Sequence, residues 1–415
     1  MTSLSKRTES QDLVRGGVML AGAMAIANAG NYVVNVGLGR WLSPAEFADA
    51  NLMVTVFLLV TAIAIGLQFV AAKATDDAAV AWLRRRARIA GALLAVVLGA
   101  GAPVWKSVFA CRSAWPFVVL ALAMPCYLTQ AVGRGVLQGR LDLKRLSWSF
   151  VVEMIVRVVV TLGLVAAGFG VLGATFGLAG ALFATWLTVR QLTRSMDKSS
   201  EVPVDISAVL RASRLMGVLL IGQIIVNNGD ALMAKHTLPA TTAAIYAAIA
   251  LVGRAVFFLS WSVATTIYPA AARRNASGGS SQSLLLGAVG AVFAIGLSCS
   301  LAAWCVGSYA LGKVFGPLYS GHANHLALYA GATTMFAVSN LIATHEVSIG
   351  RGRDARLIVI GGLVQTVLLV VLRNTIGQLI AAQLLAMGGL TVVLGALHLR
   401  PQRVSTFNLV GAVSR

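Results

Sequence analysis

Long runs of hydrophobic residues, separated by short polar segments, extend along nearly the whole chain. A helix needs about 20 apolar residues to cross a bilayer, whereas a membrane strand needs about 10 residues that alternate in polarity. The runs here, such as 151–167 and 357–372, are continuous and do not alternate. We therefore expect an all-α integral membrane protein of about twelve spans. The predicted spans are 16–39, 47–72, 88–110, 114–133, 146–168, 170–189, 211–234, 242–270, 284–310, 325–349, 356–372 and 376–398.

The composition excludes the classes of protein that fold in water. Hydrophobic residues make up 58% of the 415 residues, charged residues only 11%, and the mean hydropathy is +0.82. A soluble globular protein has about 25% charged residues. The four cysteines show no CxxC spacing and have no histidine at a metal-ligand spacing. We expect them to be small core residues, and we expect no metal site and no cofactor.

The net charge of +19 reports on membrane topology. In a soluble protein it would indicate nucleic acid, but the cytoplasmic loops of a membrane protein collect Lys and Arg. The two tails and the even-numbered loops hold 25 of the 33 basic residues, Arg134 and the run Arg84–Arg88 among them, and the odd-numbered loops hold six. We expect both termini in the cytoplasm, solvated basic loops facing anionic lipid headgroups, and no nucleic-acid partner.

Two halves of the chain resemble each other. Leu-Ser-Pro-Ala at 42–45 follows the first span and Leu-Pro-Ala at 238–240 follows the seventh, while the fourth and tenth spans both end near a Gly-Arg pair, at 139–140 and 350–351. Six spans per half give both halves the same orientation, as in transporters built from parallel repeats. We expect a tail at 1–15, a six-helix bundle at 16–189, a linker at 190–210, a second bundle at 211–398 and a tail at 399–415.

Charges inside spans are expensive, so they pair or face a cavity. Glu153 and Arg157 are four residues apart on the fifth span, a spacing that lets them pair on one helix face. Asp230 near the end of the seventh span and Arg254 in the eighth can meet across their hairpin. Each pair is either a packing pair or part of a site for an anion. Glu346, beside a histidine at the inner end of the tenth span, is either an interfacial residue or linked to ions.

Uncharged amides also occur in the spans, Gln68 and Asn228 among them. Such groups either bind sugar hydroxyls or hold helices together. Asn228 belongs, with Asp230, to the densest polar group in any predicted span.

Motifs of soluble catalysts are missing from the sequence. It contains no GxxxxGK[ST], HExxH or GxSxG pattern, and no predicted outer loop is as large as those of glycan polymerases. The loop after the second span lacks the basic motif of major-facilitator transporters. We therefore expect a transporter that is not an enzyme.

Several segments, in order and at corresponding spans, resemble Wzx-type polysaccharide flippases of the multidrug/oligosaccharidyl-lipid/polysaccharide (MOP) exporter superfamily. The resemblance covers about residues 15–372, with Ala48 where the family usually has Gly. It is carried by Leu42-Ser43-Pro44-Ala45-Glu46-Phe47-Ala48, Arg134-Gly135-Val136-Leu137-Gln138-Gly139, Asn228-Gly229-Asp230-Ala231-Leu232-Met233-Ala234-Lys235, Ile245-Tyr246-Ala247-Ala248, Gly253-Arg254 and Tyr268-Pro269.

The resemblance implies two six-helix bundles around a central cavity, in a bacterial inner membrane. It implies a lipid-linked oligosaccharide, carried on undecaprenyl pyrophosphate, that is flipped to the periplasmic leaflet with an H⁺ or Na⁺ gradient, alongside polysaccharide polymerase or export machinery. We expect the substrate to contact Arg157, Arg254, Asn228 and Gln68, and the ion to act through Asp230, Glu153 or Glu346. The alternative is a cation-coupled multidrug antiporter of the same superfamily, which would need an acid-rich cavity.

Overall fold

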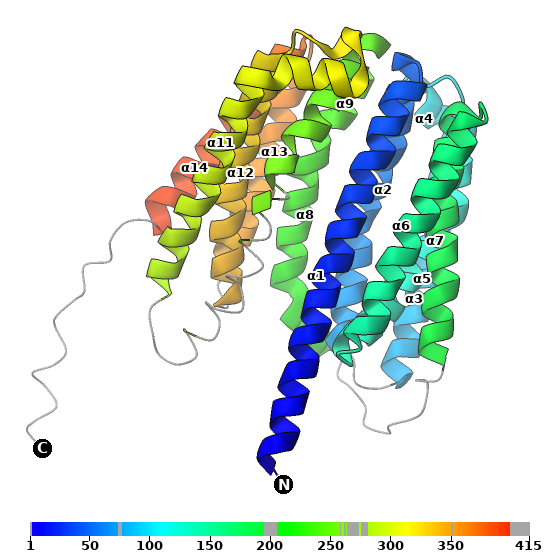
Figure 1. Cartoon of the computed structure of the whole chain (residues 1–415), viewed down its shortest axis with the longest axis vertical. Coiled ribbons are helices and arrows are strands. Elements are labelled where there is room, and N and C mark those ends of the chain that lie inside the picture. Colours follow the sequence, from blue (N-terminus) through cyan, green and yellow to red (C-terminus); the bar gives the residue numbers. More distant parts are fainter. Residues whose placement is uncertain are drawn as a thin grey trace, which may run out of the picture.

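The computed structural model describes residues 2–73, 77–194, 206–257, 281–349 and 352–398, with 259, 260, 263 and 274 besides. Side chains are described outside 2–14 and 206–214. Within these ranges every regular element is a helix, as the hydrophobic runs predict (Figure 1). The first half contains α1 (Thr2–Trp41), α2 (Pro44–Lys73), α3 (Asp77–Ala100), α4 (Ala102–Val108), α5 (Trp115–Gly139), α6 (Leu143–Ala166) and α7 (Gly170–Arg194). The second half contains α8 (Ile206–Thr237), α9 (Ala240–Gly253), α11 (Gln282–Phe315), the short 3₁₀ helix η1 (Pro317–Tyr319), α12 (Ala323–Ser348), α13 (Arg353–Val371) and α14 (Ile376–His398).

Eleven described helices are long and apolar enough to cross a membrane, and the pair α3 and α4 brings the number to twelve if it is counted as one broken span. The chain is therefore a multi-pass membrane protein. The two members of this pair are bent by 59° at Gly101. Pro103 follows directly in the first turn of α4, where a missing backbone donor costs least. Across the bend, Trp105 Nε1 donates to the carbonyl of Val97 at 2.9 Å.

Two predictions about the inner loops are wrong. The basic run Arg84–Arg88 lies on α3, which begins at Asp77 and not at residue 88. Arg85, Arg86 and Arg88 are exposed on this helix. Helix α5 likewise continues past residue 133 to Gly139, so Arg134 is a buried helical residue and not part of a loop. Both errors arise because a hydropathy window ends a span at the first charge.

Both ends of the predicted linker at 190–210 are helical in the structure. Helix α7 continues to Arg194 and α8 starts at Ile206. The predicted end of the eighth span at 270 lies outside the described residues, as does the C-terminal tail at 399–415. The last span, 376–398, coincides with α14.

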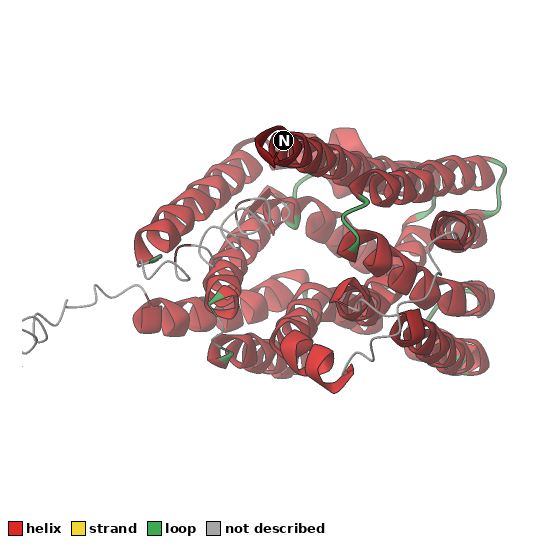
Figure 2. Cartoon of the chain, turned by 90° about the horizontal axis from the view of Figure 1, so that it is seen from below, coloured by secondary structure: helices red, strands yellow, loops and turns green. Residues whose placement is uncertain are grey.

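The helices pack as two groups. Helices α1 to α7 pack among themselves, and so do α8 to α14, while α2 makes most of the contacts between the groups by packing on α8 and α9. In Figure 1 the helices of the second group lean away from those of the first toward the end where the N-terminus lies. Figure 2, viewed from that end, shows the two groups side by side.

A capping box starts α2 and fixes its outer end. Ser43 is the N-cap, Pro44 occupies the first helical position, and Glu46 stands three residues after the cap. The Glu46 carboxylate accepts from the Ser43 backbone N–H at 3.0 Å and from its hydroxyl at 2.6 Å. The Glu46 backbone N–H in turn donates to the Ser43 hydroxyl at 3.4 Å. This reciprocal arrangement satisfies backbone donors that a helix start otherwise leaves unpaired. The segment 42–48 is thus a helix-start signal.

The two groups are joined by polar and aromatic contacts at the end where α1 stops and α2 starts. Lys235 Nζ of α8 lies 2.6 Å from Asp49 Oδ1 of α2, and both side chains are buried. Arg40 of α1 donates to the carbonyls of Lys313 and Val314 of α11. Phe47, which is fully buried, packs against Phe315 and Tyr319, with ring centroids 5.9 and 6.3 Å away. The structure is therefore closed at this end, which the charge count predicts to be periplasmic.

Two glycines let α5 approach α2 closely. A Cβ on Gly135 would lie 2.3 Å from the carbonyl oxygen of Gln68, and a Cβ on Gly139 would lie 2.2 Å from that of Ala72. Small residues four apart allow this kind of backbone contact between membrane helices. The segment 134–139 therefore sets the spacing between α2 and α5, and it places Arg134 and Gln138 at the same crossing.

We predict that Gly135→Ala and Gly139→Ala each destabilise the protein by about 1–3 kcal/mol, since the obstructing atoms belong to the backbone and cannot rotate away. Gly180→Ala on α7, where nothing lies within 4 Å of the added Cβ, is the matched control. Thermal unfolding in one detergent compares the three variants. Equal stability of Gly135→Ala and Gly180→Ala would contradict the close α2–α5 packing.

Candidate functional site

An arginine–glutamate–arginine triad lies inside the first helix group. Glu153 of α6 binds two guanidinium groups: Arg157 Nη2 lies 2.7 Å from Oε1, and Arg134 Nη2 of α5 lies 2.8 Å from Oε2. Arg157 is one turn after Glu153 on the same helix, as predicted, whereas Arg134 comes from the neighbouring helix. Two arginines around a single carboxylate leave this triad with a formal charge of +1.

Further groups fix both arginines in position. Arg157 Nη1 donates to Asn31 Oδ1 of α1 at 2.9 Å, and Arg134 donates to the hydroxyl and the carbonyl of Ser149, both at 3.0 Å. The Arg157 guanidinium stands over the Phe57 ring at 5.1 Å, and that of Arg134 stands over the Phe150 ring at 4.0 Å. These residues bring four helices, α1, α2, α5 and α6, to one cationic cluster.

The three side chains of the triad are buried, which strengthens the attraction of their excess positive charge for an anion. Arg134 and Arg157 are only 6% and 8% exposed, and the Glu153 side chain is 12% exposed. In a membrane interior, an unbalanced cation attracts an anion far more strongly than it would in water. The guanidinium fork also matches the geometry of carboxylate and phosphate groups. An arrangement of this kind is suited to hold an anionic group.

A second network is centred on Asp230, which is fully buried in α8. Arg254 Nη2, immediately after α9, lies 2.7 Å from Oδ1. The hydroxyls of Tyr246 in α9 and Tyr329 in α12 donate to Oδ2 at 2.9 and 2.7 Å. Gln383 of α14 donates to the Tyr246 hydroxyl at 2.7 Å, and Arg254 Nε donates to the Tyr329 hydroxyl at 3.0 Å.

The predicted contact of Asp230 with Arg254 is thus present, and it belongs to a larger network with no net charge. Three donors surround the Asp230 carboxylate, which offsets the cost of burying it.

The remaining predicted site residues lie apart from these networks. Gln68 of α2 donates to Gln138 of α5 at 2.8 Å, beside the glycine crossing. Asn228 is 4% exposed and donates to the Ile224 carbonyl of its own helix at 3.0 Å. Glu346 lies in the last turn of α12, beside His345, which is 3.1 Å away. The structure does not bring these three residues together.

Four members of the two networks are not predicted from the sequence: Arg134, Tyr246, Tyr329 and Gln383. Arg134 could have been found from the sequence, because it is the first residue of the Arg134–Gly139 segment that resembles polysaccharide flippases. Tyr246 lies in a quoted segment too, but a tyrosine in an apolar run is also typical of a membrane interface. Nothing in the sequence marks Tyr329 or Gln383.

Cys111 lies between α4 and α5, close to the Asp49–Lys235 pair, and it is buried. Burial, with a smaller effect of the Asp49 carboxylate, raises the pKa of the Cys111 thiol to about 12. The thiol therefore stays protonated at neutral pH and unreactive, which agrees with its prediction as a small core residue.

We predict that Asp230→Asn lowers the unfolding free energy by about 3–5 kcal/mol, since it leaves the Arg254 cation buried without its counter-ion. Tyr246→Phe removes one hydrogen bond and should cost about 1 kcal/mol. Asp142→Asn, at the more exposed cap of α6, serves as the control. Chemical unfolding in bicelles measures all three. A loss in Asp230→Asn no larger than in Tyr246→Phe would argue against a charged Asp230.

No family model matches the chain, and no curated protein sequence matches it. Several solved structures are similar to the chain. An inward-facing multidrug resistance MATE family transporter of the MOP superfamily has a TM-score of 0.73 and 14% identity, over 93% of this chain and 99% of that one. The lipid II flippase MurJ, in an inward closed conformation, has a TM-score of 0.75 and 10% identity, over 92% and 87% of the two chains.

A third structure, a MOP superfamily transporter from Pyrococcus furiosus described as having a binding pocket of reverse polarity, has a TM-score of 0.66 and 17% identity over 92% and 95%. Identities this low establish the fold alone. The chain has the fold of MOP superfamily transporters, which agrees with the predicted architecture of two bundles.

Proposed function

We propose that this protein is a membrane transporter that flips a lipid-linked oligosaccharide with a phosphate-rich headgroup from the cytoplasmic to the periplasmic leaflet. The observation that carries the proposal is the excess positive charge of the Arg134–Glu153–Arg157 triad, which is buried among the helices of the first group. A pyrophosphate cannot enter hydrocarbon without a compensating cation. The fold supports the proposal, because it is shared with a flippase for lipid II.

The triad is the primary anion site in this proposal. Arg157 and Arg134 bind the headgroup through their guanidinium groups, and Glu153 holds the two cations at a fixed separation. Gln68, paired with Gln138, offers amide groups to the glycan. The polyprenyl tail remains in the lipid, where its hydrocarbon costs nothing to solvate.

The Asp230 network supplies the proposed coupling to an ion gradient. While Asp230 is a carboxylate it holds Arg254. A proton on Asp230 removes the partner of Arg254, and the guanidinium is then free to bind a second oxygen of the anionic headgroup. Proton uptake and substrate binding are thereby linked at one residue, and the outer contacts around Asp49 and Lys235 open once the headgroup is held.

The alternative, a multidrug antiporter for cations, needs a binding region of the opposite charge. A multidrug resistance transporter and a lipid II flippase both have this fold. The two described networks sum to a charge of +1, because the Asp230–Arg254 pair is neutral. Cationic drugs would be repelled by this charge, which is why we favour the anionic lipid-linked glycan.

Variants that change the net charge of the triad test this function most directly. Arg157→Gln reduces the triad to charge 0, and the double variant Arg157→Gln with Glu153→Gln returns it to +1 on Arg134. In cells depleted of the wild-type protein, lipid-linked oligosaccharide is quantified in each leaflet. We predict at least a tenfold lower flipping rate for Arg157→Gln, about 1.4 kcal/mol, and recovery of most of the activity in the double variant.

Arg85→Gln, at an exposed position of α3, removes the same charge outside the networks and should leave flipping unchanged. A double variant that reaches the membrane but transports no better than Arg157→Gln would contradict the role of net charge. Unaltered lipid-linked glycan in the depleted cells, together with new sensitivity to cationic drugs, would favour the antiporter.

A further inference from the structure

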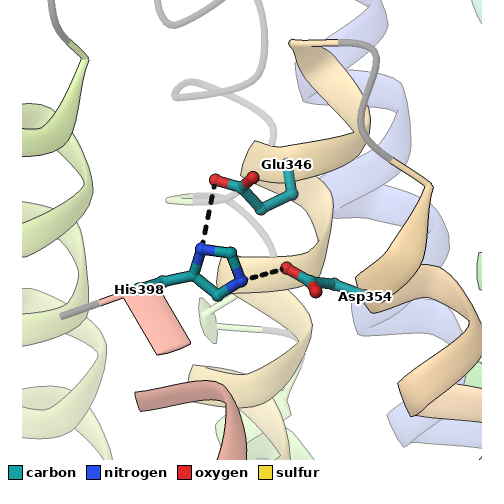
Figure 3. A group of neighbouring side chains, drawn as sticks. All are labelled: Glu346, Asp354 and His398. Atoms are coloured by element: carbon teal, nitrogen blue, oxygen red, sulfur yellow. Dashed lines mark ion pairs between the residues drawn. The ribbon is translucent and has the colours of Figure 1, made fainter. Parts of the chain in front are cut away.

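A cluster of potential metal ligands lies at the end of the second helix group where α12 and α14 end and α13 begins, away from both networks. Glu346 comes from the last turn of α12, Asp354 from the first turn of α13, and His398 from the last turn of α14. Figure 3 shows the imidazole of His398 between the two carboxyl groups. Its Nε2 lies 2.6 Å from Asp354 Oδ2, and its Nδ1 lies 3.7 Å from Glu346 Oε1.

The three residues offer one ligand atom each, and these atoms all lie within 4.8 Å of one another. Metal–ligand bonds of about 2.0–2.2 Å in a tetrahedral site place the ligand atoms about 3.3–3.6 Å apart, so the longest separation must shorten by at most about 1.5 Å, which rotation of the side chains can supply. The chemistry of the donors narrows the choice of ion. Imidazole with carboxylates suits Zn²⁺ and its first-row neighbours, whereas Mg²⁺ and Ca²⁺ prefer oxygen ligands alone.

Burial distinguishes this cluster from an ordinary charged surface. The side chains of Glu346 and Asp354 are 4% and 2% exposed. Three separate helices converge here, so the ligands are held by the packing of the bundle and not by a single flexible loop. His398 is 19% exposed, which leaves a route for an ion from the end of α14.

A second set of contacts orients the cluster from outside. His345 Nδ1 lies 3.1 Å from Glu346 Oε1, and its Nε2 lies 2.8 Å from the hydroxyl of Ser281. Hydrogen bonds to a ligating carboxylate are a regular feature of metal sites, because they fix the orientation of the ligand. Ser281 and His345 thus hold Glu346 in place by a chain that begins just before α11.

We propose that Glu346, Asp354 and His398 form a binding site for one divalent transition-metal cation, of which Zn²⁺ is the best match. The ion takes one imidazole nitrogen and one oxygen from each carboxylate, and it displaces any proton shared between His398 and Asp354. Metal uptake therefore releases protons. By joining α12, α13 and α14, the ion stabilises this end of the second helix group. This site is independent of the proposed flippase activity.

The test is a metal count on purified full-length protein that carries a tag without histidines. The protein is stripped with a chelator, loaded with Zn²⁺, freed of excess metal and analysed by mass spectrometry for zinc. We expect about one zinc ion per wild-type chain, and at least a tenfold weaker zinc affinity in Asp354→Asn and in His398→Gln. His322→Gln, in the tilted His322–His325 pair at the start of α12, is the matched control and should bind zinc like the wild type.

Cobalt gives a readout that needs no variant. Co²⁺ bound to nitrogen and oxygen ligands at this site should show visible absorption bands that zinc abolishes, and zinc should raise the melting temperature of the wild type more than that of Asp354→Asn. Size-exclusion chromatography confirms that each variant is folded. A wild-type protein that retains no zinc and shows no cobalt bands would overturn the proposal. Equal zinc binding in wild type and folded Asp354→Asn would do the same and would identify the zinc as adventitious only.

Discussion

The cost of placing charge in hydrocarbon shapes the interior of this protein more than any other constraint. Four of the cations discussed above have a carboxylate within hydrogen-bonding distance: Arg134 and Arg157 share Glu153, Arg254 has Asp230, and Lys235, near the end of α8, has Asp49. Two of these groupings are neutral. The triad is the exception, with one more cation than carboxylate. Ionisable residues inside membrane proteins commonly mark substrate or ion pathways, and the triad is the feature from which the proposed function follows.

Close backbone packing places these charges. The glycine crossing of α5 on α2 sets Arg134 at the depth of Glu153, and the capping box of Ser43 and Glu46 starts α2 at the point where Asp49 reaches Lys235. The segments that resemble polysaccharide flippases thus have identifiable physical roles: one starts a helix, one sets a helix spacing, and one carries the Asp230 carboxylate. Their order along the chain reflects the fold as much as the substrate.

The fold could be predicted from the sequence because continuous hydrophobic runs of span length have one stable solution in a bilayer. Helix ends were predicted less well. Arg134 stays in α5 because Glu153 compensates its charge, and that compensation comes from another helix. The Asp230 network could not be predicted either, because Tyr329 and Gln383 are single polar residues on helices that are distant from Asp230 in the sequence. The Glu346, Asp354 and His398 cluster has no motif spacing at all, because each ligand belongs to a different helix.

The central claim is that the excess charge of the triad selects an anionic lipid. Native mass spectrometry of the purified protein tests it most directly, with undecaprenyl-pyrophosphate-linked oligosaccharide and a lipophilic cation offered in competition. The account predicts that the wild type retains the anionic lipid, and that Arg157→Gln binds it at least about tenfold more weakly. Equal retention by both proteins, or a preference of the wild type for the cation, would contradict it.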